Sequence, residues 1–127
     1  MLAKAHIGVE EYLGLVFDDR PAPDYVDGEV VERALPTIKH SAIQALLIMI
    51  LAPLAKQIGL LLRPELRVQI SDRRYRVCDL AIFEKTAHLE GRYATEPALV
   101  VVEILSPDDR HSRLADGLED YRQWGVK

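Results

Sequence analysis

The sequence has few of the features that mark secreted, membrane-spanning or strongly basic proteins. Its 127 residues include one cysteine, Cys78, which excludes an internal disulfide and fits a reducing compartment. The most apolar run, residues 45–52, is much shorter than the roughly 20 residues that a membrane helix needs. The first residues also lack the charged and apolar segments of an export signal. We therefore expect a cytoplasmic protein without a membrane partner.

The chain also lacks an excess of positive charge. Sixteen lysines and arginines stand against 20 aspartates and glutamates, so no global basic field predicts a nucleic-acid partner. A local basic patch is compatible with this balance. Apolar residues make up 49% of the chain and charged residues 28%, which is an ordinary globular composition. Length and composition together predict one domain over residues 1–127.

Helical spacing of apolar residues predicts three helices. The first is a short amphipathic helix over residues 9–17, with Leu13, Val16 and Phe17 facing inward. The second covers residues 40–58, ends at Gly59, and should be kinked or split by Pro53. We expect this second helix to be the main core helix because of its wide apolar face, formed by Ile43, Leu46, Leu47, Ile50, Leu51 and Leu54.

Turn residues and alternating patterns predict the strands. Asp27-Gly28 predicts a hairpin within residues 25–32, because both turn positions favour positive φ. Residues 65–70 alternate between apolar and polar, and residues 76–83 return as a second strand after a polar turn. This order of elements predicts an α/β fold with a mixed sheet flanked by helices.

The stretch over residues 97–109 is the most informative part of the chain. Its run of apolar residues before Glu103 predicts a central strand that is covered on both faces. Ser106, Pro107 and Asp109 are typical of the start of a helix, with a capping serine, a first-turn proline and a capping-box acid. The third helix should follow to about residue 124, with Leu114, Leu118 and Tyr121 at helical spacing.

Two acids, Asp79 and Glu103, each lie inside an apolar strand. An unpaired buried charge is strongly disfavoured, so each acid needs a partner. If the two strands are neighbours, both carboxylates could hold one hard cation such as Mg²⁺ or Mn²⁺, which would activate water and polarise a phosphodiester. Alternatively, each acid is paired with its own arginine. The residues alone leave both interpretations open.

Five segments carry a resemblance to a known family. They cover residues 26–32, 36–41, 76–83, 101–109 and 118–126, in order along nearly the whole chain. Together they resemble the Uma family of putative restriction endonucleases, within the PD-(D/E)XK nuclease superfamily. The resemblance implies a restriction-endonuclease-like core. It also implies catalytic, metal-binding roles for Asp79 and Glu103, which match the motif aspartate and glutamate.

The motif of this chain departs from the family pattern at three positions. Cys78 replaces the motif proline, and Leu105 stands where the motif lysine is expected. In similar proteins the lysine has moved into the following helix, at the position that is Gly117 here. A lysine would orient the attacking water and stabilise negative charge, and glycine does neither. Arg110 or Arg113 could reach the site, but an arginine stays protonated.

The chain ends at Lys127, whereas similar proteins continue into another core strand. The resemblance therefore implies a C-terminally shortened sheet with an unpaired edge. We expect a second copy of the chain to cover that edge, which predicts a homodimer.

Other residues are auxiliary candidates. His40 matches a family position and could line the cleft, although a helix-start histidine is an equally good interpretation. Glu29 could add a third acid to the site. Arg73, Arg74 and Arg76 could bind nucleic-acid phosphates, or they could simply form a solvated hairpin tip.

Two functions from different classes follow from these residues. The first is a divalent-metal-dependent endonuclease that hydrolyses phosphodiesters in DNA, with Mg²⁺ or Mn²⁺ as cofactor. The intact Asp79 and Glu103 favour it. The second is a catalytically silent, dimeric relative that acts as a binding or scaffold protein. Gly117 and the early end of the chain favour this alternative.

Overall fold

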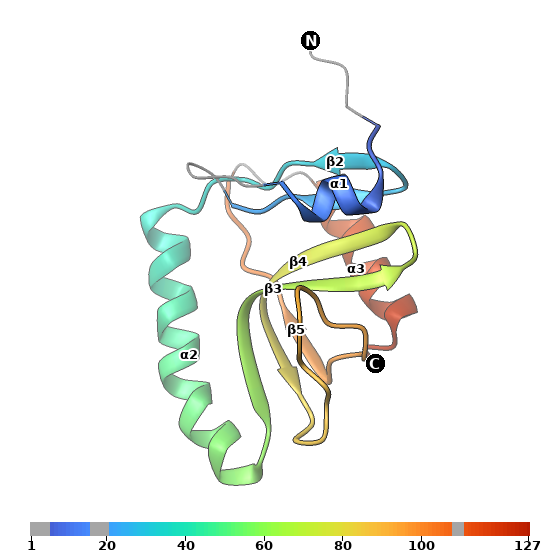
Figure 1. Ribbon diagram of the computed structural model, residues 1–127. Helices are drawn as coiled ribbons and strands as arrows, with labels where there is room; N and C mark the ends of the chain where they lie inside the picture. Colours follow the sequence, from blue (N-terminus) through green and yellow to red (C-terminus); the bar gives the residue numbers. More distant parts are fainter. Residues whose placement is uncertain (1–5, 16–20, 108–110) are drawn as a thin grey trace.

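A computed structural model of the protein describes residues 6–15, 21–107 and 111–127 (Figure 1). The predicted α/β fold is confirmed. The elements occur in the order α1 (Val9–Leu13), β1 (Asp24–Val26), β2 (Glu29–Val31), α2 (Ile38–Ile58), β3 (Leu61–Ser71), β4 (Arg74–Phe83), β5 (Val100–Val102) and α3 (His111–Trp124).

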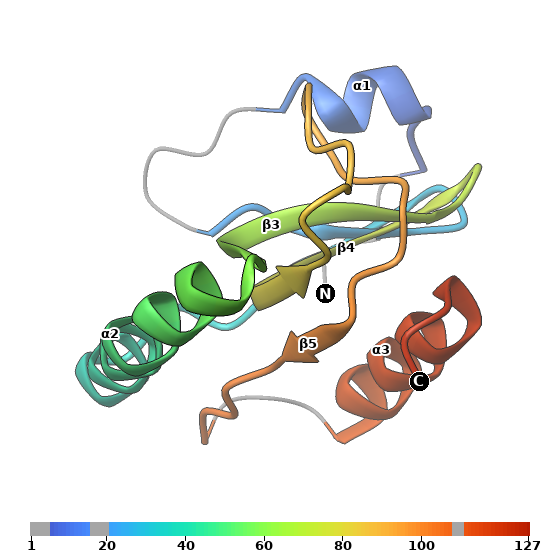
Figure 2. The ribbon, with the colours of Figure 1, turned by 90° about the horizontal axis from the view of Figure 1, so that it is seen from below.

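Strand β4 is the centre of the five-stranded sheet. It pairs with β3 along its length, with β1 near its start, and with β5 near its end. These ladders are antiparallel, as is the β1–β2 hairpin, while a parallel bridge joins Val68 to Ala94 in the polar connection. Figure 2 shows β4 and β5 between the two longer helices, α2 and α3.

The predicted hairpin turn and helix ends are confirmed. Asp27 and Gly28 have φ angles of 49° and 95°, as a turn with two positive φ values requires. Thr37 Oγ1 accepts a hydrogen bond from the His40 amide and begins α2, and Gly59 ends α2 in the left-handed conformation. Helix α2 continues through Pro53 and is not split.

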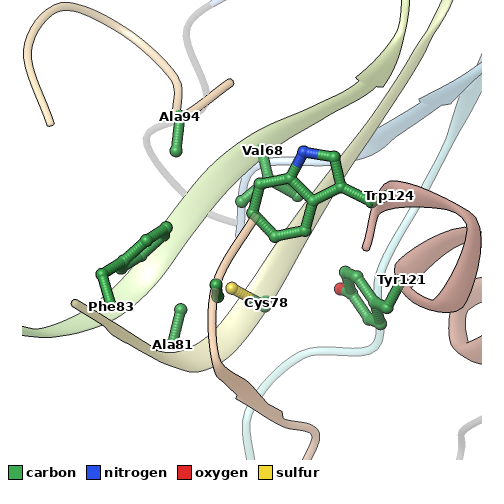
Figure 3. Close-up of a cluster of buried hydrophobic side chains, with 8 residues drawn as sticks. Val68, Cys78, Ala81, Phe83, Ala94, Tyr121 and Trp124 are labelled. Carbon is green, nitrogen blue, oxygen red and sulfur yellow. The ribbon is translucent and has the colours of Figure 1, made fainter. Parts of the chain in front are cut away.

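Two clusters of buried side chains form the core. In the larger cluster, Tyr121 and Trp124 project from α3 toward Val68 and Cys78 of the sheet (Figure 3). Trp124 also donates a hydrogen bond to the carbonyl of Thr95 at 2.9 Å. The smaller cluster packs three tyrosines from α1, β1 and β4 around Leu13, namely Tyr12, Tyr25 and Tyr75.

The prediction that α2 is the main core helix is wrong. Ala55 is its one buried residue, and the apolar side chains of Leu46, Met49 and Ile50 are 54%, 71% and 54% exposed. The physical reason is that α2 lies beside β3, so only one side of the helix meets the sheet (Figure 1). By length and composition alone, α2 is long and apolar enough to cross a membrane. The apolar run at residues 45–52 is only the middle part of this longer apolar helix.

Three other expectations need correction. Strand β5 is short and is not a central strand, because it pairs only with β4 among the described residues. It is not fully covered either, since Val100 is 44% exposed. Leu118 is exposed on α3, whereas Tyr121 is buried as expected. Helix α1 ends at Leu13, and the expected contributions of Val16, Phe17, Asp109 and Arg110 lie outside the described residues.

Candidate functional site

The structure brings Asp79 and Glu103 together. Asp79 lies in β4 and is 2% exposed, and Glu103 directly follows β5. The ladder pairs Leu80 with Val102, so the next residues outward are cross-strand neighbours. Both acids line one small pocket, which we call the acid pocket and define by Arg33, His40, Asp79, Glu103, Ile104 and Arg113. Their roles as catalytic residues and metal ligands remain predictions.

Several donors surround the Asp79 carboxylate. Arg33 Nη2 lies 3.0 Å from Oδ1, and His40 Nε2 lies 3.3 Å from the same oxygen. The Ile104 amide donates to Oδ2 at 2.7 Å. The sequence left open whether the two acids share a cation or each pair with an arginine. Asp79 has an arginine partner and also lies beside Glu103, so its position is compatible with both interpretations.

Arg33 is a site residue that the sequence reasoning missed. Its side chain is 8% exposed, and Nη1 lies 3.1 Å from Oε2 of Glu65. Glu65 is a non-glycine residue with φ of 47°, and its Oε1 accepts a hydrogen bond from Gln44 of α2. Arg33 follows β2 in a segment with no motif of its own, so only its distance to Asp79 identifies it.

Glu103 has a different partner. The Tyr121 hydroxyl donates a hydrogen bond to Glu103 Oε1 at 2.6 Å. Burial raises the pKa of Glu103 from 4.5 to about 8; the tyrosine hydrogen bond lowers this pKa, and the neighbouring Asp79 charge raises it further. The sequence reasoning assigned Tyr121 to the core, which is correct, but missed its second contact with the candidate site.

The raised pKa of Glu103 predicts how stability depends on pH. The folded protein holds the Glu103 proton more tightly than the unfolded chain does, so this residue contributes stability that is complete below pH 4.5 and is lost as pH rises to about 8. The loss is at most about 5 kcal/mol. We expect Glu103→Gln, which stays neutral, to unfold at a higher temperature than the wild type at pH 8.5 without added metal.

Thermal unfolding of both proteins at pH 5 and pH 8.5 measures this effect. Tyr121→Phe is a useful companion variant, because it removes the hydroxyl and leaves the carboxyl to titrate. A Glu103→Gln protein that loses stability between these pH values as steeply as the wild type would contradict the prediction.

Among the auxiliary candidates, His40 lines the acid pocket. Its side chain is 10% exposed, and its buried Nδ1 has no hydrogen-bond partner among the described residues. Glu29 does not join the site: its carboxylate lies 3.6 Å from His6, and it is not among the residues that line the acid pocket. The reason is that Glu29 begins β2, which pairs with β1 rather than with β4.

The predicted nucleic-acid contact at Arg76 is wrong. Arg76 is 2% exposed, with Nε 2.7 Å from Asp120 and Nη1 3.2 Å from Asp24. Arg74 is also engaged, by Asp27 and Asp120. Arg73 is exposed, and its proposed phosphate contact stays a prediction. Two of these three arginines therefore tie the sheet to carboxylates of the fold rather than offering an open basic patch.

Gly117 lies beside a second hollow on the other side of Glu103. We call it the Gly117 hollow; it is lined by Glu103, Gly117, Arg113, Asp24 and Tyr121 among others. A Cβ added at Gly117 would meet no atom within 4 Å. A side chain can therefore start at this position without a clash at its Cβ, beside a hollow that Glu103 also lines. Cys78, in contrast, is buried in the core, and burial raises the pKa of its thiol well above the ordinary value.

The donor set fits a hard divalent ion held by few protein ligands. Mg²⁺ is commonly bound by one or two carboxylates, with waters and substrate phosphates completing its coordination. Asp79 and Glu103 supply two carboxylates in one pocket, and Glu103 Oε2 is not used by the Tyr121 bond. The described part of the chain contains no group of three or more acidic, histidine or cysteine side chains placed to hold a metal.

Comparisons with known proteins agree with this geometry. The chain is similar to the crystal structure of a putative nuclease belonging to DUF820 from Anabaena variabilis, with 26% identity and a TM-score of 0.78. The alignment covers 94% of this chain and 70% of that one. No curated protein matches the sequence. The family model Uma2, described as putative restriction endonuclease, matches residues 9–127. The chain therefore belongs to the Uma2 family of putative restriction endonucleases.

Proposed function

We propose that the protein is a divalent-metal-dependent endonuclease that hydrolyses phosphodiesters in DNA. The observation that carries the proposal is that the buried Asp79 and the half-buried Glu103 line one pocket together with Arg33 and His40. The family description and the nuclease similar to this chain support a nuclease-like function. The ion would be Mg²⁺ or Mn²⁺, which are the hard cations that carboxylates select.

Asp79 and Glu103 would hold the ion, which, when bound, polarises the phosphodiester and makes water acidic enough to attack it. The chain's other residues position these ligands. Arg33 and the Ile104 amide hold the Asp79 carboxylate in place from two sides, and Tyr121 orients Glu103. His40 has a free Nδ1 at the pocket and can accept or donate a proton there.

Cleavage assays test this function directly. Wild-type protein incubated with plasmid and single-stranded DNA in Mg²⁺ or Mn²⁺ should cut at least one of the two substrates. Glu103→Ala should lose this activity by about 100-fold or more, because one of two carboxylate ligands is removed. Agarose and denaturing gels of the time course measure the rates.

The control is Glu96→Ala, which removes a glutamate that lines a separate groove at the far end of β5. It should cut DNA like the wild type. Cleavage that survives in Glu103→Ala would come from a contaminating nuclease, and the absence of cleavage by the wild type under every condition would contradict the proposal.

The exposed side of α2 favours the second candidate, a silent dimeric binding or scaffold protein. Ile43, Leu46, Ile50 and Leu54 are all exposed and recur at three- and four-residue spacing, which suits the packing of two copies of one helix. An apolar surface of this kind is typical of an interaction site. The homodimer expected from the sequence, in which a second copy covers an unpaired sheet edge, stays a prediction. The exposed side of α2 is a different interface, and we propose it for the same dimer.

Size-exclusion chromatography with light scattering tests the dimer. We expect the wild type to have the mass of two chains at micromolar concentration. Ile50→Glu should shift it to the mass of one chain, because a charge in an apolar helix interface is strongly disfavoured. Lys56→Glu, on another side of the same helix, should leave the mass unchanged. A well-folded wild-type monomer would contradict the prediction.

A further inference from the structure

We propose that Arg113 binds a phosphate group in the acid pocket, with its Nε–H as the donor. This inference rests on the proposed function, because it assigns a ligand chemistry to the same pocket. The phosphate group could belong to a DNA backbone or be free inorganic phosphate. Both present the oxygen acceptors that a guanidinium binds best.

The position of Arg113 is the first observation. It lies in the first turn of α3. Within the part of the chain that the structure describes, Arg113 and Glu103 are the charged side chains that line both the acid pocket and the Gly117 hollow. Its Nη2 donates a hydrogen bond to Asp24 Oδ2 at 2.8 Å, and this bond holds the guanidinium in position. The side chain as a whole is 19% exposed.

The hydrogen-bond state of the guanidinium is the second observation. Arg113 Nε is buried and has no hydrogen-bond partner among the described residues. A buried donor without an acceptor destabilises the folded protein. The neighbouring carboxylates already accept other bonds, Asp79 from Arg33 and the Ile104 amide, and Glu103 from Tyr121. An oxygen brought by a ligand would satisfy this donor.

The charges around the pocket favour a phosphate bound together with a cation. Arg33, His40 and Arg113 line one small space together with Asp79 and Glu103. A phosphate oxygen beside Arg113 would face the acids, which repel it unless a cation lies between them. Arg113 is therefore assigned the phosphate, and the acids the cation. This also gives the site a fixed positive charge in the region where Gly117 supplies none.

Binding measurements on three variants test the inference. Arg113→Gln removes the charge, Arg113→Lys keeps the charge and its attraction to Asp24 but removes Nε, and Arg122→Gln removes an exposed arginine from the same helix. Fluorescence anisotropy with a labelled DNA duplex in Ca²⁺ measures affinity. We expect about tenfold weaker binding by Arg113→Gln, a smaller loss by Arg113→Lys at an unchanged melting temperature, and no change by Arg122→Gln.

Inorganic phosphate is the second probe. It should raise the melting temperature of the wild type and of Arg122→Gln, and not of Arg113→Gln. If the stabilisation by inorganic phosphate depends on Arg113 but the affinity for the duplex does not, the ligand that Arg113 binds is free phosphate rather than the DNA backbone. If Arg113→Gln binds both probes like the wild type, or the wild type binds neither, the inference is overturned.

A calorimetric titration of Mn²⁺ separates this result from the proposed function. Arg113→Gln should bind Mn²⁺ like the wild type, because Arg113 is not a ligand. If the wild type neither binds Mn²⁺ nor cuts DNA, but its affinity for either probe depends on Arg113, the nuclease proposal fails and the phosphate site stands. If the wild type cuts DNA and Arg113→Gln cuts it with unchanged KM and kcat, the nuclease proposal stands and the phosphate site at Arg113 fails.

Discussion

Asp79→Ala is expected to abolish binding of Mn²⁺ and, with it, cleavage of DNA. The carboxylate of Asp79 is buried at the centre of the sheet and is held by Arg33 and the Ile104 amide, so the substitution removes a fixed ligand. We expect the affinity for Mn²⁺ to fall by about 100-fold or more. Isothermal titration calorimetry of the wild type and the variant measures this difference, and equal heats would remove the metal site.

Loss of Asp79 also leaves Arg33 with less charge compensation in a buried position, which can cost about 3–5 kcal/mol of stability. Asp79→Asn limits this damage because it preserves the size of the side chain and its acceptor for the Ile104 amide. Asp120→Asn is the matched control, since Asp120 is also a buried acid bound to an arginine but does not line the acid pocket. It should keep the wild-type affinity for Mn²⁺.

Gly117→Lys is expected to have the largest gain of function. The resemblance to the family implies a lysine at this position. A Cβ added there would meet no atom within 4 Å, and Gly117 and Glu103 line the same hollow. A charged amine aimed at developing negative charge contributes about 100-fold to rate in comparable sites. Replacing a glycine inside a helix also stabilises the helix by up to about 1 kcal/mol. Initial rates of DNA cleavage in Mg²⁺ compare the variant with the wild type.

Two control variants separate the amine from the backbone effect. Gly117→Ala gains only the helix stability, and Gly117→Met fills the hollow with an uncharged chain of similar length. Both should cut DNA no faster than the wild type. If Gly117→Lys matched Gly117→Met in rate, the hollow would not be a lysine position, and the silent alternative would be favoured.

Local sequence patterns predicted the parts of the fold that depend on near neighbours. The Asp27-Gly28 turn and the Gly59 end of α2 are where the patterns place them, and β3 and β4 contain the two predicted strands but begin earlier. Each depends on the conformational preference of one or two residues or on alternation along a single strand. The sequence also indicated that Asp79 and Glu103 need partners, because an acid inside an apolar strand is disfavoured when it is unpaired.

Contacts between distant segments could not be predicted in the same way. The apolar face of α2 predicts burial, but whether a helix is covered depends on which elements lie against it. Helix α2 lies at the side of the sheet and makes most of its contacts with β3. Arg76 looks like part of a basic hairpin, but Asp24 and Asp120, which are 52 and 44 residues away, enclose it. No local pattern contains this information.

The sequence by itself determined which residues can carry chemistry, namely the two buried acids Asp79 and Glu103, and where the turns and helix ends lie. Only the tertiary structure decided that Arg33 and Tyr121 contact these acids, that Arg113 reaches both hollows, and that the outer side of α2 is exposed. The physical reason is the range of the interactions. Backbone preferences and periodicity act over a few residues, whereas ion pairs and burial depend on where the sheet brings distant segments together.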